Sequence, residues 1–360
     1  MTHSPRHHAF EAALAPVDVA EARPADIDAW RAFAAARPEA TIFHDPAWGE
    51  VAERAYGHQP LRLIARRGTA VVGILPLTDV RGALFGRNLI STAFTVGGGV
   101  LAVDEATRDA LCATAEAAAN ARGAGYVELR SDAAAAGWIA KDGVYAGYAR
   151  PLASDPEAEL GAVPRKRRAE VRKGLAAASE GRMSITHEAS AADFHALYAR
   201  SLRDLGTPTP PLRFVAELAN ALGDRAFFTI VSVDGVPAFS VMSFLHRGVV
   251  MPYYAGVTPL ARAAKAADFG YFEIMNEARR RGMAAFDFGR SKVGSPHAYY
   301  KKSWGFEPTP ITYRYFLARA RQTPNVNPSN PKFRLLTNAW RRIPLPLANV
   351  IGPLVARELA

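Results

Sequence analysis

Apolar and polar positions along the chain repeat one order of elements in its two halves. In the first half they predict two strands joined by a turn, a third strand, a helix and a closing strand, at residues 61–80, 87–103, 104–125 and 126–132. The second half predicts the same elements in the same order, at residues 226–248, 249–258, 260–282 and 283–291. Two segments with helix periodicity precede each set, at residues 26–37 and 45–57 and at residues 191–206 and 211–223. The pattern therefore predicts a tandem duplication.

Turn and cap residues mark the ends of these elements. The pair Asp234-Gly235 favours a two-residue hairpin turn between the first two strands of the second half. Asp104 is a suitable N-cap for the helix of the first half, and Gly123 and Gly282 end the two helices. The order strand-strand-strand-helix-strand predicts an antiparallel sheet to which a crossover helix adds a last, parallel strand. We therefore expect an α+β fold in two domains.

The predicted domain limits follow the repeat. They define an N-terminal extension, a first domain, a basic helical linker, a second domain and a basic amphipathic C-terminal tail, at residues 1–24, 25–160, 161–182, 183–320 and 321–360. In the linker, six of the nine residues from Arg165 to Lys173 are basic. This helix either presents a solvated charged face or contacts phosphate groups or a polymer.

Composition narrows the class of protein. The 360 residues include 44 Lys and Arg against 34 Asp and Glu, which gives a net charge of +10 and favours anionic partners. Cys112 is the single cysteine, so an intramolecular disulfide and a multi-cysteine zinc site are excluded, and we expect it to be a buried apolar side chain. No clustered metal-ligand motif, secretory signal pattern or long apolar run occurs, so we expect a cytoplasmic protein without a metal.

Particular phrases resemble a known family. The order of elements is that of the GNAT (N-acetyltransferase) fold, and two such domains joined by a basic helix resemble the FemAB family of acyl and aminoacyl transferases. The phrases FDFGRS (residues 286–291), YYKKSWGFEP (299–308) and FHDPAWGEVAERAYGH (43–58) look like the FemAB-like subfamily associated with exosortase (PEP-CTERM) systems. The resemblance covers roughly residues 25–318.

The resemblance implies two tandem GNAT-like domains, each a mixed, mostly antiparallel sheet flanked by helices, and it implies acyl transfer to an amine. Characterised FemAB members take an amino acid from aminoacyl-tRNA, whereas relatives in the wider superfamily use acyl-CoA. Either would be a co-substrate, with no bound cofactor, and tRNA is then a partner. The implied acceptor is an anionic small molecule or a lipid-linked glycan or peptidoglycan-type precursor of the cell envelope or of an exopolysaccharide.

A cationic loop follows the last strand of the second half. Asp287 lies on this strand, Arg290 lies just beyond it, and Lys292 and Lys301 follow on the loop. Because the carboxyl end of a parallel strand is a usual ligand site, the loop is predicted to hold a pyrophosphate or carboxylate. The alternative is that Arg290 and Lys301 pair with acids such as Asp287 and only fix the loop. In the family, the residues that match Tyr300 and Lys301 contact the phosphorylated substrate.

Residues 251–258 fall on the strand whose bulge, in GNAT proteins, donates a backbone N–H to the acyl carbonyl. Pro252 suits an edge or bulge position. Tyr253 and Tyr254 should alternate faces, and we expect Tyr254 to face the site and to orient or protonate the leaving group. Packing of both in the core is the alternative. Asp287 is the candidate general base, and its alternative is a structural partner for Arg290.

The start of the crossover helix departs from the CoA-binding pattern of the family. The stretch Arg262 to Ala267 has Lys265 at the central glycine position. Arg262 and Lys265 are nevertheless the candidates for holding the donor, because a lysine side chain could replace contacts that bare backbone N–H groups make elsewhere. This departure weakens the prediction of acetyl-CoA as the donor and leaves aminoacyl-tRNA or another donor open.

The C-terminal tail combines basic and apolar residues. Beyond residue 320 it has six Lys and Arg against one Glu, with Leu, Trp, Ile and Val between them. It either lies on the anionic inner face of a membrane or docks as a helix on the domains.

The leading hypothesis is therefore a FemAB-like transferase that moves an acyl group to an amine of an envelope or exopolysaccharide precursor. The alternative is a non-catalytic protein that binds an anionic glycan or a nucleotide-sugar. A nucleic-acid-binding module has only the net charge in its favour.

Overall fold

The fold is taken from a computed structural model, which describes residues 16–324 and 331–359, with side chains at 331–335 and 359 left out. Most of the predicted N-terminal extension therefore lies outside the described residues. By its contacts the chain forms two compact units. Among the described residues, unit 1 comprises 16–142, 312–324 and 358–359, and unit 2 comprises 143–311 and 331–357.

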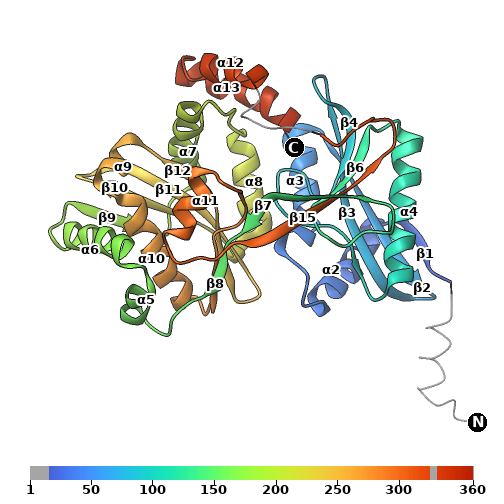
Figure 1. The fold of residues 1–360 in the computed structure, drawn as a ribbon, viewed down its shortest axis with the longest axis horizontal. Helices are drawn as coiled ribbons and strands as arrows, with labels where there is room; N and C mark the ends of the chain where they lie inside the picture. Colours follow the sequence, from blue (N-terminus) through green and yellow to red (C-terminus); the bar gives the residue numbers. More distant parts are fainter. Residues whose placement is uncertain (1–15, 325–330, 360) are drawn as a thin grey trace, which may run out of the picture. The chain divides into compact units, whose positions relative to one another are not determined.

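Unit 1 is built on a mixed sheet (Figure 1, blue to teal). Its strands are β1 (Asp18–Glu21), β2 (Gln59–Arg67), β3 (Ala70–Gly82), β4 (Gly86–Ile90), β5 (Leu101–Ala102), β6 (Tyr126–Leu129), the first part of β7 (Ile139–Gly147) and the last part of β15 (Thr309–Leu317). The order is β1-β2-β3-β4-β6-β15, with β5 beside β3. Pairing is antiparallel except between β4 and β6, as the crossover-helix prediction requires.

Helices cover this sheet. They are α2 (Ile27–Ala36), α3 (Ala47–Tyr56) and α4 (Glu105–Arg122), with 3-10 turns η1 (Pro24–Asp26), η2 (Ile42–His44) and, near the C-terminus, η4 (Arg357–Leu359). The Asp104 side chain caps α4 by accepting from the Thr107 backbone N–H at 2.8 Å, and Gly123 ends the helix in the left-handed conformation, as predicted. Cys112 on α4 is fully buried, and burial raises the pKa of its thiol to about 11. It is therefore a core side chain, as expected.

Unit 2 repeats the arrangement. Its strands are β8 (Ala149–Pro151), β9 (Met183–Thr186), β10 (Ala226–Val233), β11 (Val236–His246), β12 (Val249–Val257), β13 (Ala285–Asp287) and β14 (Ser291–Lys292). The six-stranded sheet has the order β8-β13-β12-β11-β10-β9, and only β12 and β13 are parallel. Asp234 and Gly235 both have positive φ in the β10–β11 hairpin, as the Asp-Gly signal predicts.

The helices of unit 2 differ from the prediction at two points. They are α5 (Pro156–Ala162), α6 (Arg165–Ser179), α7 (Ala191–Leu205), α8 (Leu212–Leu222), α9 (Pro259–Ala264), α10 (Ala266–Arg280), α11 (Pro296–Lys302), α12 (Pro331–Trp340) and α13 (Leu345–Ala356), with the 3-10 turn η3 (Gly223–Arg225). The single crossover helix expected over residues 260–282 is split at Lys265, which takes a φ of 60°. Tyr300 and Lys301, expected on a loop, lie on α11, whose first turn is capped by Ser295.

The two halves of the sequence exchange strands. β8 follows the first copy in the chain but pairs with β13 in the sheet of unit 2. β15 follows the second copy but pairs with β6 in the sheet of unit 1, from Arg314 opposite Leu129 to Leu317 opposite Tyr126. The contact units therefore differ from the predicted ranges 25–160 and 183–320, because β7 and β15 each run from one unit into the other.

The basic helix α6 is part of unit 2 and packs on α10. Val171, Gly174 and Ala177 form its buried face, and a Cβ on Gly174 would lie 2.5 Å from the Cβ of Phe269. The close approach of the two backbones thus depends on glycine. The residues of α6 that this contact leaves outside are mostly Arg and Lys.

Candidate functional site

The parallel strands of unit 2 pair over a short distance and then part. Val249 pairs with Ala285 and Val250 pairs with Phe286, and these are the two residue pairs between β12 and β13. Beyond Val250, β12 continues to Val257 with β11 on one side and no described strand on the other. We call the point where the two parallel strands part, at their carboxyl ends, the opening; α/β proteins commonly bind ligands at such a point.

A β-bulge lies on β12 at this opening. Met242 pairs with Tyr254 whereas Ser243 pairs with Pro252, so Tyr253 is an extra residue. The prediction that Tyr253 and Tyr254 alternate faces is wrong, because the bulge turns both rings to one side. Their centroids lie 4.7 Å apart, and both rings contact Phe244.

Tyr254 lies among aromatic side chains from three elements. Its ring contacts Tyr198 of α7 and Phe214 of α8, at centroid distances of 5.7 and 6.4 Å, and it stays half-buried. It therefore faces α7 and α8 beside the bulge.

Asp287 ends β13 next to the opening. One carboxylate oxygen accepts the Gly289 backbone N–H at 2.7 Å, which fixes the turn after the strand. Burial raises the pKa of Asp287, against the opposing effects of this hydrogen bond and of the Lys301 charge. A carboxyl with a raised pKa is better suited to taking a proton than an exposed aspartate.

Lys301 holds the loop that follows Asp287. Its Nζ donates to the backbone oxygens of Gly289 and Arg290, each at 3.0 Å, and lies 5.4 Å from the centre of the Tyr148 ring. Burial lowers the pKa of Lys301 to about 8, although the charge of Asp287 opposes this. Two of the three N–H donors of Lys301 thus hold the turn, and its charge lies close enough to Asp287 to act on that carboxylate.

Arg290 and Lys292 flank this turn. The Arg290 guanidinium stacks on the Tyr145 ring at 4.1 Å, and the exposed Lys292 lies on β14, which pairs with β7. The structure thus brings Asp287, Arg290 and Lys301 together at one strand end, as predicted.

Tyr300 faces a buried network that the sequence did not suggest. Its hydroxyl donates to Oδ1 of Asp268 at 2.7 Å, and Arg167 of α6 donates to the same oxygen at 2.6 Å while its guanidinium stacks on the Tyr300 ring at 4.5 Å. Arg167 also donates to the Ser303 hydroxyl at 2.7 Å. Burial raises the pKa of Asp268, and the bonds from Tyr300 and Arg167 oppose that rise. The network ties α6, α10 and α11 into one corner.

Lys265 and Arg262 lie where the crossover helix is interrupted. Lys265 is exposed and adopts the left-handed backbone conformation that glycine favours. The backbone at this position is therefore the one expected for the glycine that the CoA-binding pattern has there. Arg262 is also exposed and donates to the Val257 backbone oxygen at 3.2 Å. The two candidate donor-binding residues thus follow directly after β12.

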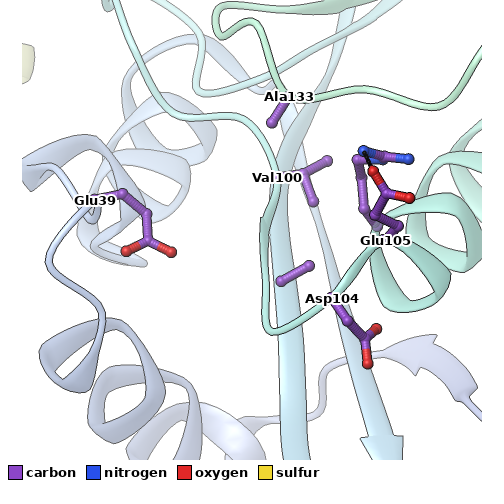
Figure 2. Close-up of a pocket in the computed structure, with 7 residues that line it drawn as sticks. Glu39, Val100, Asp104, Glu105 and Ala133 are labelled. Atoms are coloured by element: carbon purple, nitrogen blue, oxygen red, sulfur yellow. Dashed lines mark hydrogen bonds and ion pairs between the residues drawn. The ribbon is translucent and has the colours of Figure 1, made fainter.

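The corresponding place in unit 1 is acidic. A hollow of about 260 Å³ lies at the start of α4, with Glu39 on one side and Asp104 and Glu105 on the other (Figure 2). Arg108 also lines it, and each acid is paired with an arginine: Glu39 with Arg37, Asp104 with Arg67 and Glu105 with Arg108. The lining itself nevertheless has three carboxylates and one cation, unlike the start of the crossover helix in unit 2.

Residues 16–324 and 331–359 contain neither a metal-binding cluster nor a helix that could cross a membrane. In these ranges, three or more His, Cys, Asp or Glu side chains nowhere gather into a metal-binding group. No described helix has both the length and the hydropathy needed to cross a bilayer.

Comparison with known proteins agrees with this geometry. Residues 165–302, from the start of α6 to the end of α11, match the family model described as an acetyltransferase (GNAT) domain. Among curated protein sequences, none matches the chain.

Solved structures share the fold over nearly the whole chain. FemX superposes with a TM-score of 0.64 at 14% identity, covering 89% of this chain and all of that one. A tandem GNAT protein from the clavulanic acid biosynthesis pathway gives 0.54 at 14% identity, covering 86% and 99%. L-PGS from Bacillus licheniformis gives 0.53 at 12% identity, covering 92% and 99%.

The chain therefore has the predicted α+β fold of two tandem GNAT-like domains, each with a mixed sheet flanked by helices. It is similar to GNAT acyltransferases, and the match to their family model lies in unit 2.

Proposed function

We propose that the chain is a FemAB-like N-acyl or aminoacyl transferase that acylates an amine of a cell-envelope or exopolysaccharide precursor. The observation that carries the proposal is the opening between β12 and β13, which lies inside the segment matched by the GNAT model and beside the bulge at Tyr253. The similarity in fold to FemX and to L-PGS supports aminoacyl transfer. The link to exosortase systems and the cytoplasmic location stay predictions.

In the proposed reaction the amine nitrogen of the acceptor attacks the acyl carbonyl carbon of the donor. A C–N bond forms and the C–S bond of an acyl-CoA, or the C–O bond of an aminoacyl-tRNA, breaks. Asp287 takes the proton that the amine loses, directly or through water, because burial raises the pKa of this carboxyl. The Tyr254 hydroxyl gives a proton to the leaving sulfur or oxygen.

The remaining residues bind and orient the substrates. Arg262 and Lys265 hold anionic groups of the donor at the helix break, where both side chains are exposed. Arg290 and Lys292 bind an anionic group of the acceptor, and Lys301 acts by fixing the turn between them and Asp287. The buried hydroxyl of Tyr300 acts through Asp268, so Tyr300 supports the loop instead of touching substrate.

Contact of the C-terminal tail with the inner membrane face would bring such an enzyme to a lipid-linked acceptor. The proposal needs no metal and no resident cofactor, since the donor is consumed as a co-substrate.

Donor consumption tests the proposal. The full chain would be mixed with acetyl-CoA, longer acyl-CoAs or aminoacyl-tRNA and an amine-bearing peptidoglycan-type precursor, and the mass gain of the acceptor followed. We expect one donor to be consumed by the natural chain and by Lys302→Met, the control on the exposed neighbouring lysine, but far more slowly by Lys301→Met. Binding of an anionic glycan or nucleotide-sugar without consumption of any donor would instead establish the binding-protein alternative.

A further inference from the structure

Helix α13 carries no charge and is apolar on two opposite faces. Its twelve residues LPLANVIGPLVA include no Asp, Glu, Lys or Arg. Ala348, Gly352 and Ala356, four residues apart, are buried. The tail was predicted to be amphipathic, with basic residues on one side. Helix α13 differs from that prediction because it has no charged residue that could face water.

The inner face of α13 is used in unit 2. Gly352 lies against the backbone of Thr209, where a Cβ would come within 3.1 Å of the Thr209 nitrogen and oxygen. Helix α12 contacts the end of α7 nearby, with Arg341 donating to the Leu205 backbone oxygen at 3.3 Å. Figure 1 shows α12 and α13 (red) beside α7. The helix pair is thus held in place by its small and polar residues.

Both helices expose large apolar side chains, which we call the outer face of the pair. Leu347, Val350 and Leu354 of α13 are 48%, 69% and 65% exposed, and Leu336 of α12 is 67% exposed. On α13 these positions follow the spacing i, i+3, i+7, so they form one stripe. An exposed apolar surface on two neighbouring helices marks an interaction site.

Charge indicates what covers this stripe. The segment from Pro331 to Arg357 contains five Lys and Arg and no Asp or Glu. Arg341 and Arg342 are exposed at the turn between α12 and α13, shortly before the helix that carries the apolar stripe. Apolar side chains bordered by cations, on a helix too short to span a bilayer, fit the boundary between the head groups and acyl chains of an anionic membrane.

We propose that the outer face of α12 and α13 binds an anionic lipid surface, with α13 lying in the plane of the interface. Leu347, Val350 and Leu354 enter the acyl region, and Arg341 and Arg342 contact the lipid phosphates. The run of five cations without an acidic residue complements an anionic lipid surface, which attracts Lys and Arg, and this complementarity favours lipid over a protein partner or a second copy of the chain. The proposal stands apart from the acyl-transfer reaction, because it concerns binding in the absence of any substrate.

Vesicle sedimentation of the full chain tests the proposal. The probes are vesicles of phosphatidylcholine alone and of phosphatidylcholine mixed with phosphatidylglycerol. We expect binding to the mixed vesicles, and a loss of about tenfold or more for Val350→Glu and for Leu354→Glu. Both side chains point to solvent, so thermal unfolding should be nearly unchanged. Val236→Glu, at a 54% exposed position on the β10–β11 hairpin of the same unit, is the matched control and should bind normally.

A double variant tests the proposed contact of Arg341 and Arg342 with the lipid phosphates. Arg341→Gln with Arg342→Gln should weaken binding to the mixed vesicles roughly tenfold and leave any binding to neutral vesicles unchanged. Failure of the natural chain to bind mixed vesicles would overturn the proposal, as would equal binding by Val350→Glu. A dimer in solution that Val350→Glu dissociates would overturn it too, since a second copy would then cover the stripe.

Discussion

Units 1 and 2 share one topology but treat the ends of their parallel strands in opposite ways. In unit 1, Arg130 after β6 closes the space: it donates to Glu128 at 2.8 Å and to the Thr95 backbone oxygen at 2.5 Å. Tyr315 of the exchanged strand β15 completes this cluster with a bond to Glu128 at 3.0 Å. In unit 2, the strand end carries Asp287 together with cations that are half-buried or exposed, and beyond Val250 no described strand pairs with β12 on the side of β13.

The crossover helices of the two units also begin with residues of opposite charge. Helix α4 begins with the acidic pair Asp104 and Glu105, and α10 begins after Lys265. The strand end of unit 1 is thus occupied by the paired side chains of Arg130, Glu128 and Tyr315, whereas that of unit 2 carries Asp287 and cationic residues. The two units share one topology, so topology alone does not determine where a binding site lies. The residues at the strand ends determine it.

The largest effect should come from Asp79, which unit 1 uses for stability. This fully buried carboxylate binds Arg87 at 2.5 and 2.8 Å, Arg81 at 3.1 Å and Arg122 at 3.4 Å. Asp79→Asn removes the buried charge that these three arginines share, although Arg122 keeps a second ion pair with Glu21 at 3.6 Å. We therefore expect the free energy of unfolding to fall by about 3 kcal/mol or more in denaturant titration. Donor binding by the folded protein should not change.

The pH dependence of the same carboxylate gives a second readout. Burial favours the neutral form, but the bonds from Arg87 and Arg81 outweigh it and lower the pKa of Asp79 to about 2. Since the folded pKa lies below the unfolded value of about 3.9, the stabilisation is complete above that value and is lost as pH falls through the folded pKa. An acid-stability difference between the natural chain and Asp79→Asn that stayed constant over this range would contradict the assignment.

The next largest effect concerns Lys301 in unit 2. Lys301→Met removes both bonds to the turn after Asp287, so we expect turnover to fall on the order of 100-fold, measured as acceptor acylation in a single turnover. Because burial lowers the pKa of Lys301 to about 8, below that of an unfolded lysine, its contribution to stability should grow as pH rises from the folded value to about 10.4. An undiminished rate would show that the turn does not serve catalysis.

Tyr254 should have a smaller effect. If its hydroxyl protonates the leaving group, Tyr254→Phe lowers turnover about tenfold or more and leaves the ring packing against Tyr198 and Phe214 intact. Tyr253→Phe, on the neighbouring bulged residue, is the matched control. Equal turnover of the two variants would show that neither tyrosine hydroxyl takes part in the reaction and that both rings only pack.

The smallest effect is on stability at the helix break. Lys265→Gly relieves the positive φ of 60° and should raise the free energy of unfolding by up to about 1 kcal/mol. The corresponding change at the start of α4, Asp104→Ala, removes a side-chain cap and should lower it by about 1 kcal/mol. Changes of the same sign at the two positions would contradict the opposed roles of these helix starts.

Local patterns predicted most of the fold. Alternation and helix periodicity placed the strands and helices of both halves, because each depends on neighbours within a few residues. The break at Lys265 was missed because the surrounding alanine-rich stretch favours a continuous helix and contains no glycine or proline. The exchange of β8 and β15 was missed because alternation identifies a strand but not the sheet that it joins.

The candidate site was predicted only in part. The position of Asp287, Arg290 and Lys301 at one strand end follows from the order of elements. A bulge on this strand was expected from the resemblance and from Pro252, but its place at Tyr253 was not, since an extra residue on a strand changes no local pattern. Asp268 bonds to Arg167 and Tyr300, which lie 101 and 32 residues away in the sequence. Local sequence patterns do not indicate which arginine of the basic helix pairs with which acid, so this network could not be predicted.

Donor binding tests the central contrast between the two units most directly. Calorimetric titration of acetyl-CoA, longer acyl-CoAs and aminoacyl-tRNA, at several salt concentrations, would compare the natural chain with Lys265→Glu in unit 2 and Glu105→Lys in unit 1. We predict saturable binding of one donor that Lys265→Glu weakens about tenfold or more and that Glu105→Lys leaves unchanged. Binding that survives Lys265→Glu but responds to Glu105→Lys would place the donor in unit 1 and contradict the account.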